Sequence, residues 1–433
     1  MTGCKDFISL SFLFLIMHDY QAMDEVRDAI HGFIQFNDWE REIINHPAFQ
    51  RLRRIRQLGM SDLVYPGTTH TRFEHSLGVM HLGSKIFDNV ILRSECNFNK
   101  DDIERDRIIV RLACLLHDIG HSPFSHAGEE FMPNNNDTSF THEDYSAGII
   151  RFVLNDVIEN HPLNKNYNIK ADEVARLIVG PSDNNTCRYW HNIISSQLDA
   201  DRSDYLLRDS YYAGVKYGVF DLDRILVMTT LYDKNDSPSF AIKEDGINAA
   251  EALIIARYMM FKQVYFQETR RICDFHANEY VKKLLNQSDL KGVFPEPTSK
   301  ENLQEYLKWD DFYVWGQMTQ DRNDRHVKAL FERRHDRCIY CSTVFGEKRF
   351  EENEKIERWK EKLKEKNIEL WVDNADSNWY KRDTEEIKIL MTDGKLKNLS
   401  QLSQFLINLE KSPIVRLYVP VDSVKQAKEI IKE

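Results

Sequence analysis

The 433-residue chain is poor in cysteine, glycine and proline. Its seven cysteines are odd in number and scattered, which excludes a disulfide framework and leads us to expect a reducing cytoplasm. With 17 glycines and 11 prolines it shows no low-complexity tract, and we find no internal repeat. An excess of positive charge is also missing, because 58 Lys and Arg stand against 69 Asp and Glu, a net charge of −11. This balance argues against a protein that coats nucleic acid with a basic surface.

No apolar run is long enough to cross a membrane. The run Phe7–Met17 has 11 residues, whereas a transmembrane helix needs about 20. A signal peptide is disfavoured as well, since no small-residue cleavage site follows, only the polar residues 18–21. Met23 opens a polar stretch typical of a protein start. We therefore expect no membrane partner, and we interpret residues 1–23 as an N-terminal extension that says nothing about localisation.

Hydrophobic residues are plentiful and follow a helical period. They make up 42% of the chain, and aromatic residues 11%, which is enough for a large core. From residue 24 to about 290 the apolar positions recur at helical spacing, most clearly in residues 103–116 and 249–264. This pattern predicts a mostly α fold with one large helical domain over residues 24–345.

The pattern changes after residue 345. A highly charged helix is expected over residues 351–366, and short strands over residues 368–372, 387–390 and 415–419. Helices are expected over residues 399–409 and 424–431. These elements predict a small α+β subdomain at residues 346–433.

Histidine is concentrated in one part of the chain. Seven of the 15 histidines lie between His70 and His142. At the centre, the adjacent pair His117-Asp118 ends an apolar helix, and two neighbouring side chains can lean toward one metal between them. His121 follows one turn after His117 on the same face. A lone histidine is usually structural, but this crowding indicates a functional site.

Two further segments add ligands to this pair. Residues 72–75 contain a histidine, and residues 199–205 contain several aspartates. One His, the His-Asp pair and a distant Asp form a four-ligand set that suits a borderline divalent metal such as Zn, Mn or Fe. Such a set leaves positions open for water or phosphate, as metal-assisted hydrolysis requires. The competing interpretation is a set of helix-end histidines that bind no metal.

The order of these motifs resembles a known family. The segments FQRLRRIRQLG (49–59), YPG (65–67), RFEHSLGV (72–79), HDIGHSPFSH (117–126), DRSDYLLRD (201–209) and 257–265 form one series. The order H…HD…D is similar to the HD-domain metal-dependent phosphohydrolases, and the longer strings resemble their deoxynucleoside triphosphate triphosphohydrolase (dNTPase) branch. That branch includes the vertebrate SAM-and-HD-domain enzyme. The resemblance covers about residues 30–335, and no SAM domain precedes that region in this sequence.

The resemblance implies a role for each matching position. The implied metal ligands are His75, His117, Asp118 and Asp201. The implied catalytic groups are His126, Glu129, His142 and His121. The implied triphosphate-binding residues are Arg72, Arg202, Tyr205 and Arg257, and those around the deoxyribose are Gln57, Leu58, Asp209 and Tyr265. The implied cofactor is one divalent metal of unspecified identity, Mn, Mg, Fe or Zn.

The implied function is hydrolysis of a deoxynucleoside triphosphate to deoxynucleoside and tripolyphosphate. Guanidinium groups suit clustered phosphate oxygens, so an acidic protein can still bind a polyanion. An aromatic ring beneath C2′ would exclude a ribose hydroxyl. The implied partners are a nucleotide substrate and a second copy of the chain, in a dimer or tetramer. A nucleotide activator is left open, and nucleic acid is not favoured.

Two other functions stay open at this point. One is an HD-type phosphodiesterase or nuclease that acts on nucleic acid or a cyclic nucleotide. The other is a non-catalytic nucleotide sensor that works through assembly. The complete ligand set and His126 speak against the sensor, while Arg72, Tyr205 and Arg257 favour a triphosphate over a diester.

The sequence departs from the family pattern at three positions. Arg202 stands where the vertebrate enzyme has Lys, and Glu129 where a shorter Asp is usual. Asn45 replaces an Asp that reads guanine in the vertebrate allosteric site. Because an amide accepts fewer N–H donors than a carboxylate, this replacement argues against activation by GTP.

Two further clusters offer other sites. His335, Cys338 and Cys341 are possible zinc ligands, but a CxxC without a second pair is a weak signal. Residues 51–56 contain four arginines, for which an inter-subunit or nucleotide-binding role is favoured over contact with nucleic acid.

Overall fold

The computed structural model describes residues 23–94, 100–135, 138–180, 190–233, 238–342, 349–375, 386–407 and 414–432. Over these residues the fold is mostly α, which confirms the expected class. The expected N-terminal extension lies outside the described residues, apart from Met23.

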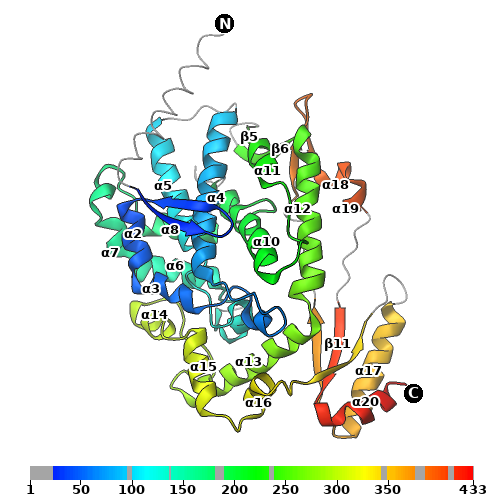
Figure 1. Cartoon of the computed structure of the whole chain (residues 1–433). Helices are drawn as coiled ribbons and strands as arrows, with labels where there is room; N and C mark the ends of the chain where they lie inside the picture. Colours follow the sequence, from blue (N-terminus) through cyan, green and yellow to red (C-terminus); the bar gives the residue numbers. More distant parts are fainter. Residues whose placement is uncertain are drawn as a thin grey trace.

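The large body of the molecule consists of helices packed around α4 (Figure 1). The longer ones are α2 (Asp38–Asn45), α4 (Arg72–Arg93), α5 (Lys100–Leu116), α6 (His142–Phe152), α8 (Ala171–Val179), α10 (Ala200–Ala213), α12 (Ile247–Met260), α13 (Glu268–Gln287) and α15 (Asp311–Gln320). The shorter ones are α3 (Pro47–Gln50), α7 (Asn155–Glu159), α9 (His191–Ile194), α11 (Leu222–Met228), α14 (Lys300–Tyr306) and α16 (Arg325–Phe331).

Helix α4 is the central element, because it is buried on almost every side. Thr71 and Glu74 form a capping box at its start, which fixes where the helix begins. Its buried residues include Leu77, Val79 and Leu82, which point in different directions around the axis. Helices α5 and α10 pack against it, and these three helices carry the metal-ligand candidates.

A β-hairpin packs against α4 and contacts α10 through its side chains. Strand β1 (Asp24–Asp28) pairs antiparallel with β2 (Gly32–Phe36), with Asp28 opposite Gly32. Residues 29–31 form the turn, and Gly32 has φ +77°, a left-handed conformation that suits glycine.

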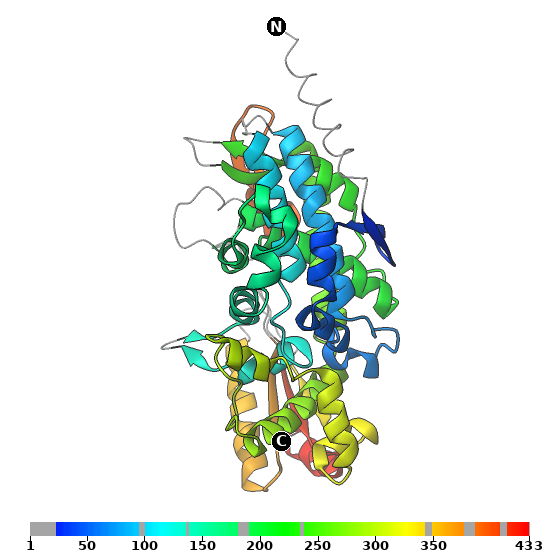
Figure 2. The same ribbon diagram turned by 90° about the vertical axis from the view of Figure 1, so that its left-hand side faces the viewer.

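The C-terminal part is divided between the two ends of the molecule (Figures 1 and 2). At one end, β7 (Arg337–Cys341), β11 (Ile414–Val419) and β8 (Trp371–Ala375) form a sheet that packs with α17 (Arg349–Glu365) and α20 (Val424–Ile430). At the other end, β10 (Leu396–Asn398) and β9 (Lys388–Leu390) extend the hairpin of β5 (Thr229–Asp233) and β6 (Pro238–Lys243).

These pairings cross the expected boundary near residue 345. Strand β9 runs parallel to β6, and Ile389 is fully buried among core residues such as Leu253 and Ile254. Strand β7, which precedes the boundary, pairs with β11, which follows it. The chain after residue 345 thus shares two sheets with the chain before it. The division into a core at residues 24–345 and a subdomain at residues 346–433 stays a prediction.

Three of the predicted elements differ in detail. The expected strand 368–372 begins at Trp371, because the N–H of Ile368 is used at the end of α17, donating to Leu363. The expected helix 399–409 is divided at Ser403 into α18 (Leu399–Leu402) and α19 (Gln404–Ile407). The helix expected to end at residue 264 stops at Met260 and continues as a π-helical turn, Phe261–Tyr265.

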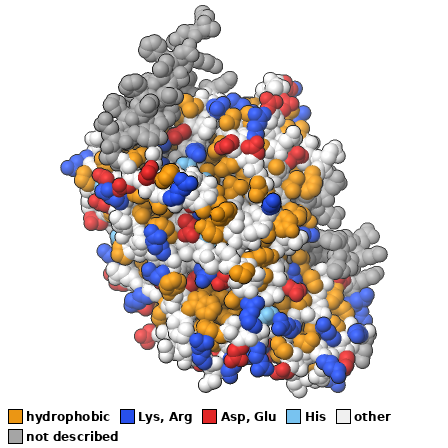
Figure 3. All heavy atoms as spheres, in the orientation of Figure 1, with side chains coloured by type: hydrophobic (Ala, Val, Ile, Leu, Met, Phe, Trp, Pro, Cys, Tyr) orange, Lys and Arg blue, Asp and Glu red, His pale blue; other side chains and the backbone are white. Residues whose placement is uncertain are grey.

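In the part of the chain that the structure describes, no helix is both long and apolar enough to span a bilayer. The surface in Figure 3 shows basic and acidic side chains interspersed rather than gathered by sign.

Candidate active site

Three helices bring the predicted metal ligands together. His75 lies in the first turns of α4, His117 and Asp118 follow the last residue of α5, and Asp201 lies in the first turn of α10. Asp199 caps α10 by accepting from the backbone N–H of Arg202 at 2.6 Å, which fixes the start of that helix beside the other two.

The ligand atoms converge at metal-site distances. Asp201 Oδ1 lies 3.0 Å from Nε2 of His75 and 3.6 Å from Nε2 of His117. Asp118 contacts the two nitrogens with different oxygens: Oδ2 lies 3.4 Å from Nε2 of His75, and Oδ1 lies 3.4 Å from Nε2 of His117. Two ligands of a tetrahedral ion with bonds of 2.0–2.1 Å are about 3.3 Å apart, so this spacing fits one shared ion.

Each histidine is oriented by its other ring nitrogen. Nδ1 of His75 lies 2.7 Å from Asp204 Oδ2, and Nδ1 of His117 lies 2.8 Å from the carbonyl oxygen of Cys114. These contacts fix each Nδ1 as the donor and leave the Nε2 lone pair free, as in metal-binding histidines. Both Nε2 atoms are buried without a hydrogen bond of their own. An unpaired buried nitrogen is costly unless a cation takes its lone pair, so the residues fit a metal.

The electrostatics of the cluster favour a cation. Burial alone would lower the pKa of His75, but the carboxylates of Asp201, Asp204 and Asp118 raise that pKa to about 10. Burial raises the pKa of Asp201, but the contacts with His117 and His75 lower it by more, so the net shift of this pKa is downward. In the absence of metal, this negative potential holds a proton on His75.

Arg72 shares the carboxylate of Asp118. Its Nη1 donates to Asp118 Oδ2, and its Nε donates to Ser125 Oγ at 2.9 Å. Arg72 is only 3% exposed, so its charge is presented to the cluster and not to bulk water. Arg72, together with His117 and His121, outweighs burial and holds the pKa of Asp118 well below its usual range.

The four predicted catalytic residues form a second cluster beside the first. Glu129 Oε1 accepts from Nδ1 of His126 at 2.9 Å and of His142 at 2.7 Å. The ring of His121 stacks on that of His142 at 3.9 Å, and its Nε2 lies 3.2 Å from Asp118 Oδ1. His121 is thus the link between the two clusters.

The second cluster is better described as hydrogen-bonded than as metal-binding. The same four residues could converge on an ion, but the distances of 2.7 and 2.9 Å are those of charge-assisted hydrogen bonds. The hydrogen bond to Glu129 outweighs burial and raises the pKa of His142 to about 9. Burial raises the pKa of Glu129, but His126 and His142 together lower it strongly. An ionised Glu129 therefore orients both rings.

Three of the four expected triphosphate-binding residues lie on α10 and α12, whereas Arg72 begins α4. Arg202 pairs with Asp199, and Arg257 donates to Gln197 at 3.2 Å. Burial raises the pKa of the Tyr205 hydroxyl. The positive charges of Arg257 and Arg202 lie close enough to this hydroxyl to offset part of that rise. Tyr205 also interacts electrostatically with Asp201, and Arg72 contacts Asp118 directly, so both residues adjoin the ligand cluster.

Of the four expected sugar-binding residues, Asp209 and Tyr265 are in direct contact. The hydroxyl of Tyr265 donates to Asp209 Oδ2 at 2.8 Å, and the Tyr205 and Tyr265 rings meet edge to face at 6.3 Å. Gln57 is 8% exposed, and its Oε1 is buried without a hydrogen bond. Leu58 is 7% exposed and begins the next turn.

A strained turn joins the two clusters. Phe124 and Ser125 have φ of +58° and +61°, which costs about 1–3 kcal/mol for each such non-glycine residue. Asp311 holds the turn, because its two oxygens accept from the N–H of Phe124 at 2.8 Å and of Arg56 at 2.9 Å. The Ser125 hydroxyl also donates to the carbonyl of Arg56 at 2.6 Å.

Sequence reasoning missed several residues of this site. Asp204 orients His75, Asp311 holds the strained turn, and His70 Nε2 lies 2.8 Å from Asp209 Oδ1. His70 belongs to the histidine-rich stretch, and Asp204 lies three residues after Asp201 on the same helix face, so both had a detectable signal. Asp311 has none, since its partners are more than 180 residues away.

The other sequence clusters contribute no further convergent site. Among the described residues, the groups able to hold a metal do not include His335, Cys338 or Cys341. Arg51 is 1% exposed and donates to the Trp309 carbonyl. Arg54 and Arg56 pair with Asp310 and Asp62.

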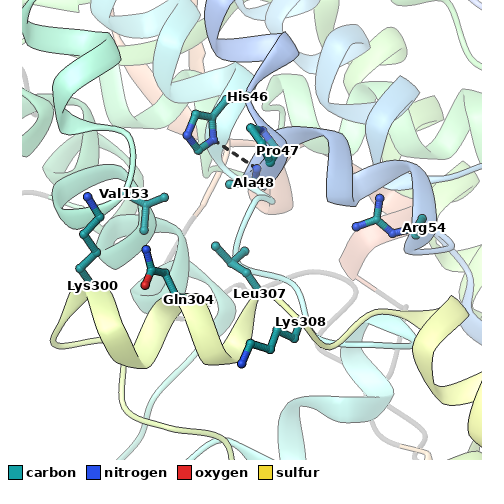
Figure 4. Close-up of a pocket in the computed structure, with 9 residues that line it drawn as sticks. All are labelled: His46, Pro47, Ala48, Arg54, Val153, Lys300, Gln304, Leu307 and Lys308. Atoms are coloured by element: carbon teal, nitrogen blue, oxygen red, sulfur yellow. Dashed lines mark hydrogen bonds between the residues drawn. The ribbon is translucent and has the colours of Figure 1, made fainter.

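A cavity of about 450 Å³ lies between α3 and α14, where His46, Arg54, Lys300 and Lys308 face it (Figure 4). None of the residues lining it belongs to the two histidine clusters. His46 follows Asn45, the position that argues against GTP activation.

Comparisons with known proteins agree with the site. The HD domain model matches residues 72–186, and the HD associated region model matches residues 220–431. The uncharacterized protein YwfO of Bacillus subtilis is 33% identical over 92% of both chains. A solved hypothetical protein from Aquifex aeolicus superposes with a TM-score of 0.78 at 28% identity, covering 94% of this chain and 100% of that one. The solved structure of a phosphohydrolase from Bacteroides thetaiotaomicron superposes with a TM-score of 0.68 at 26% identity, covering 92% of this chain and 99% of that one.

Relatives with a named activity cover less of the chain. The Dictyostelium discoideum homologue of the deoxynucleoside triphosphate triphosphohydrolase SAMHD1 is 33% identical over 58% of this chain and 47% of its own length. Human SAMHD1 is 26% identical over 69% of this chain and 51% of its own. The chain thus spans about half the length of these relatives. By its motifs, its helical core and these relatives, the chain belongs to the HD-domain phosphohydrolase family and resembles the SAMHD1 enzymes within it.

Proposed function

We propose that the protein hydrolyses deoxynucleoside triphosphates to deoxynucleoside and tripolyphosphate, with His75, His117, Asp118 and Asp201 holding one divalent metal. The observation that carries the proposal is the pair of buried, unpaired Nε2 atoms facing two carboxylates, with the buried guanidinium of Arg72 beside them. A bound divalent ion supplies Lewis acidity, which polarises a phosphoryl oxygen and acidifies water.

The arginines bind the triphosphate chain. Arg72 can exchange its contact with Asp118 for a phosphate oxygen once a metal neutralises that carboxylate. Arg202, Arg257 and the Tyr205 hydroxyl add donors on the α10 and α12 side. Fixing three phosphates in this way orients the α-phosphorus for attack by water.

The second cluster moves the proton. His126 is 67% exposed at its side chain, so a substrate can reach it, and Glu129 holds its ring through Nδ1. We assign His126 the protonation of the departing 5′-oxygen, a task that suits an imidazole near neutral pH. His142 and His121 fix Glu129 and connect it with Asp118.

The sugar network provides specificity. Asp209 has an oxygen in contact with each of Tyr265 and His70, which holds the carboxylate beside the tyrosine ring. A ribose hydroxyl placed against that ring would have neither room nor partner, which costs about 1–3 kcal/mol before any steric clash. The names of the SAMHD1 relatives support a deoxynucleotide substrate.

The test is product analysis with purified protein. Each dNTP is incubated with Mn²⁺ or Mg²⁺, and the products are separated by ion-exchange chromatography. We expect tripolyphosphate and deoxynucleoside in equal amounts. Diphosphate with a monophosphate, or shortened oligonucleotides from added nucleic acid, would contradict the proposal and favour the phosphodiesterase or nuclease. No turnover of any nucleotide, together with nucleotide-dependent assembly, would favour the sensor.

A further inference from the structure

The aspartate behind His75 is itself held by a residue of the N-terminal hairpin. Asp204 is fully buried, and its Oδ2 lies 2.7 Å from His75 Nδ1. Its other oxygen, Oδ1, lies 2.6 Å from Nε2 of His31. His31 occupies the turn between β1 and β2, and its side chain is only 4% exposed.

Asp204 is ionised and fully engaged. Arg208 donates to both of its oxygens, at 2.8 and 2.9 Å. A buried guanidinium that donates to both oxygens in this way pairs with a carboxylate and not with a neutral carboxylic acid. Since an ionised carboxylate only accepts, the facing nitrogens of both histidines must be donors. A neutral His75 therefore carries its proton on Nδ1, which leaves the Nε2 lone pair for a metal held among the ligands.

The hairpin is fixed in register for this contact. Asp28, the last residue of β1, accepts from the backbone N–H groups of Ile30 and His31, each at 2.9 Å. Its other oxygen accepts from Arg208 Nη1 at 2.7 Å. The turn that carries His31 is thus tied to the same arginine that holds Asp204.

We propose that His31 is a positioning residue for the metal: it fixes Asp204, which fixes the ring of His75. The inference rests on the proposed metal site. It also extends that site beyond the matched HD domain, residues 72–186, because both His31 and Asp204 lie outside that range. Partners of this kind typically contribute tenfold or more to metal affinity.

The test compares two variants of nearly equal shape. In His31→Gln the side-chain amide can still donate to Asp204, whereas in His31→Met it cannot. His161→Met serves as the matched control, since His161 is also buried but stacks on Trp39, remote from the ligands. Zn²⁺ affinity is measured for the full chain by competition with a chromophoric chelator, and thermal unfolding in excess chelator checks that each variant folds.

We expect His31→Met to bind Zn²⁺ about tenfold more weakly than wild type, and His31→Gln and the control to stay within about threefold. Equal affinities for wild type and His31→Met would overturn this inference and leave the proposed function standing. Equal weakening by Gln and Met would also overturn it, because shape and not the hydrogen bond would then matter. A wild-type chain that binds no Zn²⁺ would overturn the metal site and this inference together.

Discussion

At the scale of single residues, the site depends on side chains that have one free ligand atom each. His75 and His117 are held through Nδ1, so their Nε2 atoms have no alternative partner. When one ligand is removed, the remaining ligand atoms stay buried without a partner, because their side chains are held in place by other contacts. The ligand set therefore acts as a unit.

We predict that Asp118→Ala and His75→Ala each remove most of the bound metal and at least about 99% of the activity. The reason is that the metal loses one of its protein ligands in each variant. The helical fold should persist, because the ligands lie at helix ends and not in the apolar core. Metal content by mass spectrometry, activity and far-UV circular dichroism check the three parts. Full activity in either variant would remove the metal hypothesis.

We predict that Tyr265 determines the preference for deoxyribose over ribose. We predict a preference for dNTP over NTP of about tenfold to a hundredfold in kcat/KM. Tyr265→Ala should narrow that preference more than it lowers the dNTP rate, since it removes the exclusion and not the chemistry.

Tyr265→Phe is the matched control, because it keeps the ring and loses only the hydroxyl that donates to Asp209. Comparing dATP with ATP and dGTP with GTP for the three proteins gives the answer. Equal rates on both sugars in wild type would rule the exclusion out. If Tyr265 only completed the helix stripe, its loss would lower stability without a change in sugar choice.

At the scale of elements, short segments of chain hold the site and are in turn held from far away. The Phe124–Ser125 turn keeps its left-handed conformation because Asp311, at the start of α15, accepts from it and from the strand-like segment at Arg56. The first segment leads to His126 and the second to Gln57. Asp311 thus sets the spacing between the proposed catalytic and the proposed sugar-binding residues.

Asp311 gives a pH dependence whose sign follows from its environment. Burial raises its pKa to about 7, although hydrogen bonds from the Phe124 and Arg56 N–H groups lower it in part. Between about pH 4, the unfolded value, and pH 7, the folded chain binds the extra proton, so the contribution of Asp311 to stability falls as pH rises. The melting temperature of wild type minus that of Asp311→Asn should therefore decrease over this range. A difference that is constant or increases with pH would contradict the assignment.

Features that depend on residues close together in the sequence are predicted better than contacts between segments far apart in the sequence. The HD pair and the apolar periods of residues 103–116 and 249–264 are local patterns, and the structure has the helices α5 and α12 at those two periods. The contact of His31 with Asp204 joins residues 173 positions apart and leaves no pattern in either segment. Likewise, the π-helical turn at Tyr265 follows from packing against Asp209 and Tyr205, not from the composition of α12.

At the scale of the whole molecule, the chain exposes apolar side chains that suit an assembly. Val219, Phe312 and Tyr211 are 65%, 61% and 62% exposed. We predict a dimer or tetramer, since closed symmetric assemblies are the rule among soluble oligomers. Light scattering measures the mass directly. A monomer both with and without nucleotides would contradict this prediction.

The central claim is that water attacks the α-phosphorus at the metal site, so that the bond to the 5′-oxygen breaks and tripolyphosphate leaves intact. Hydrolysis of a dNTP in H₂¹⁸O tests it most directly, with Asp118→Ala as the inactive control. We expect one ¹⁸O in the tripolyphosphate, none in the deoxynucleoside, and no product from the variant. Label in the deoxynucleoside, release of diphosphate, or an unchanged rate in Asp118→Ala would contradict the account.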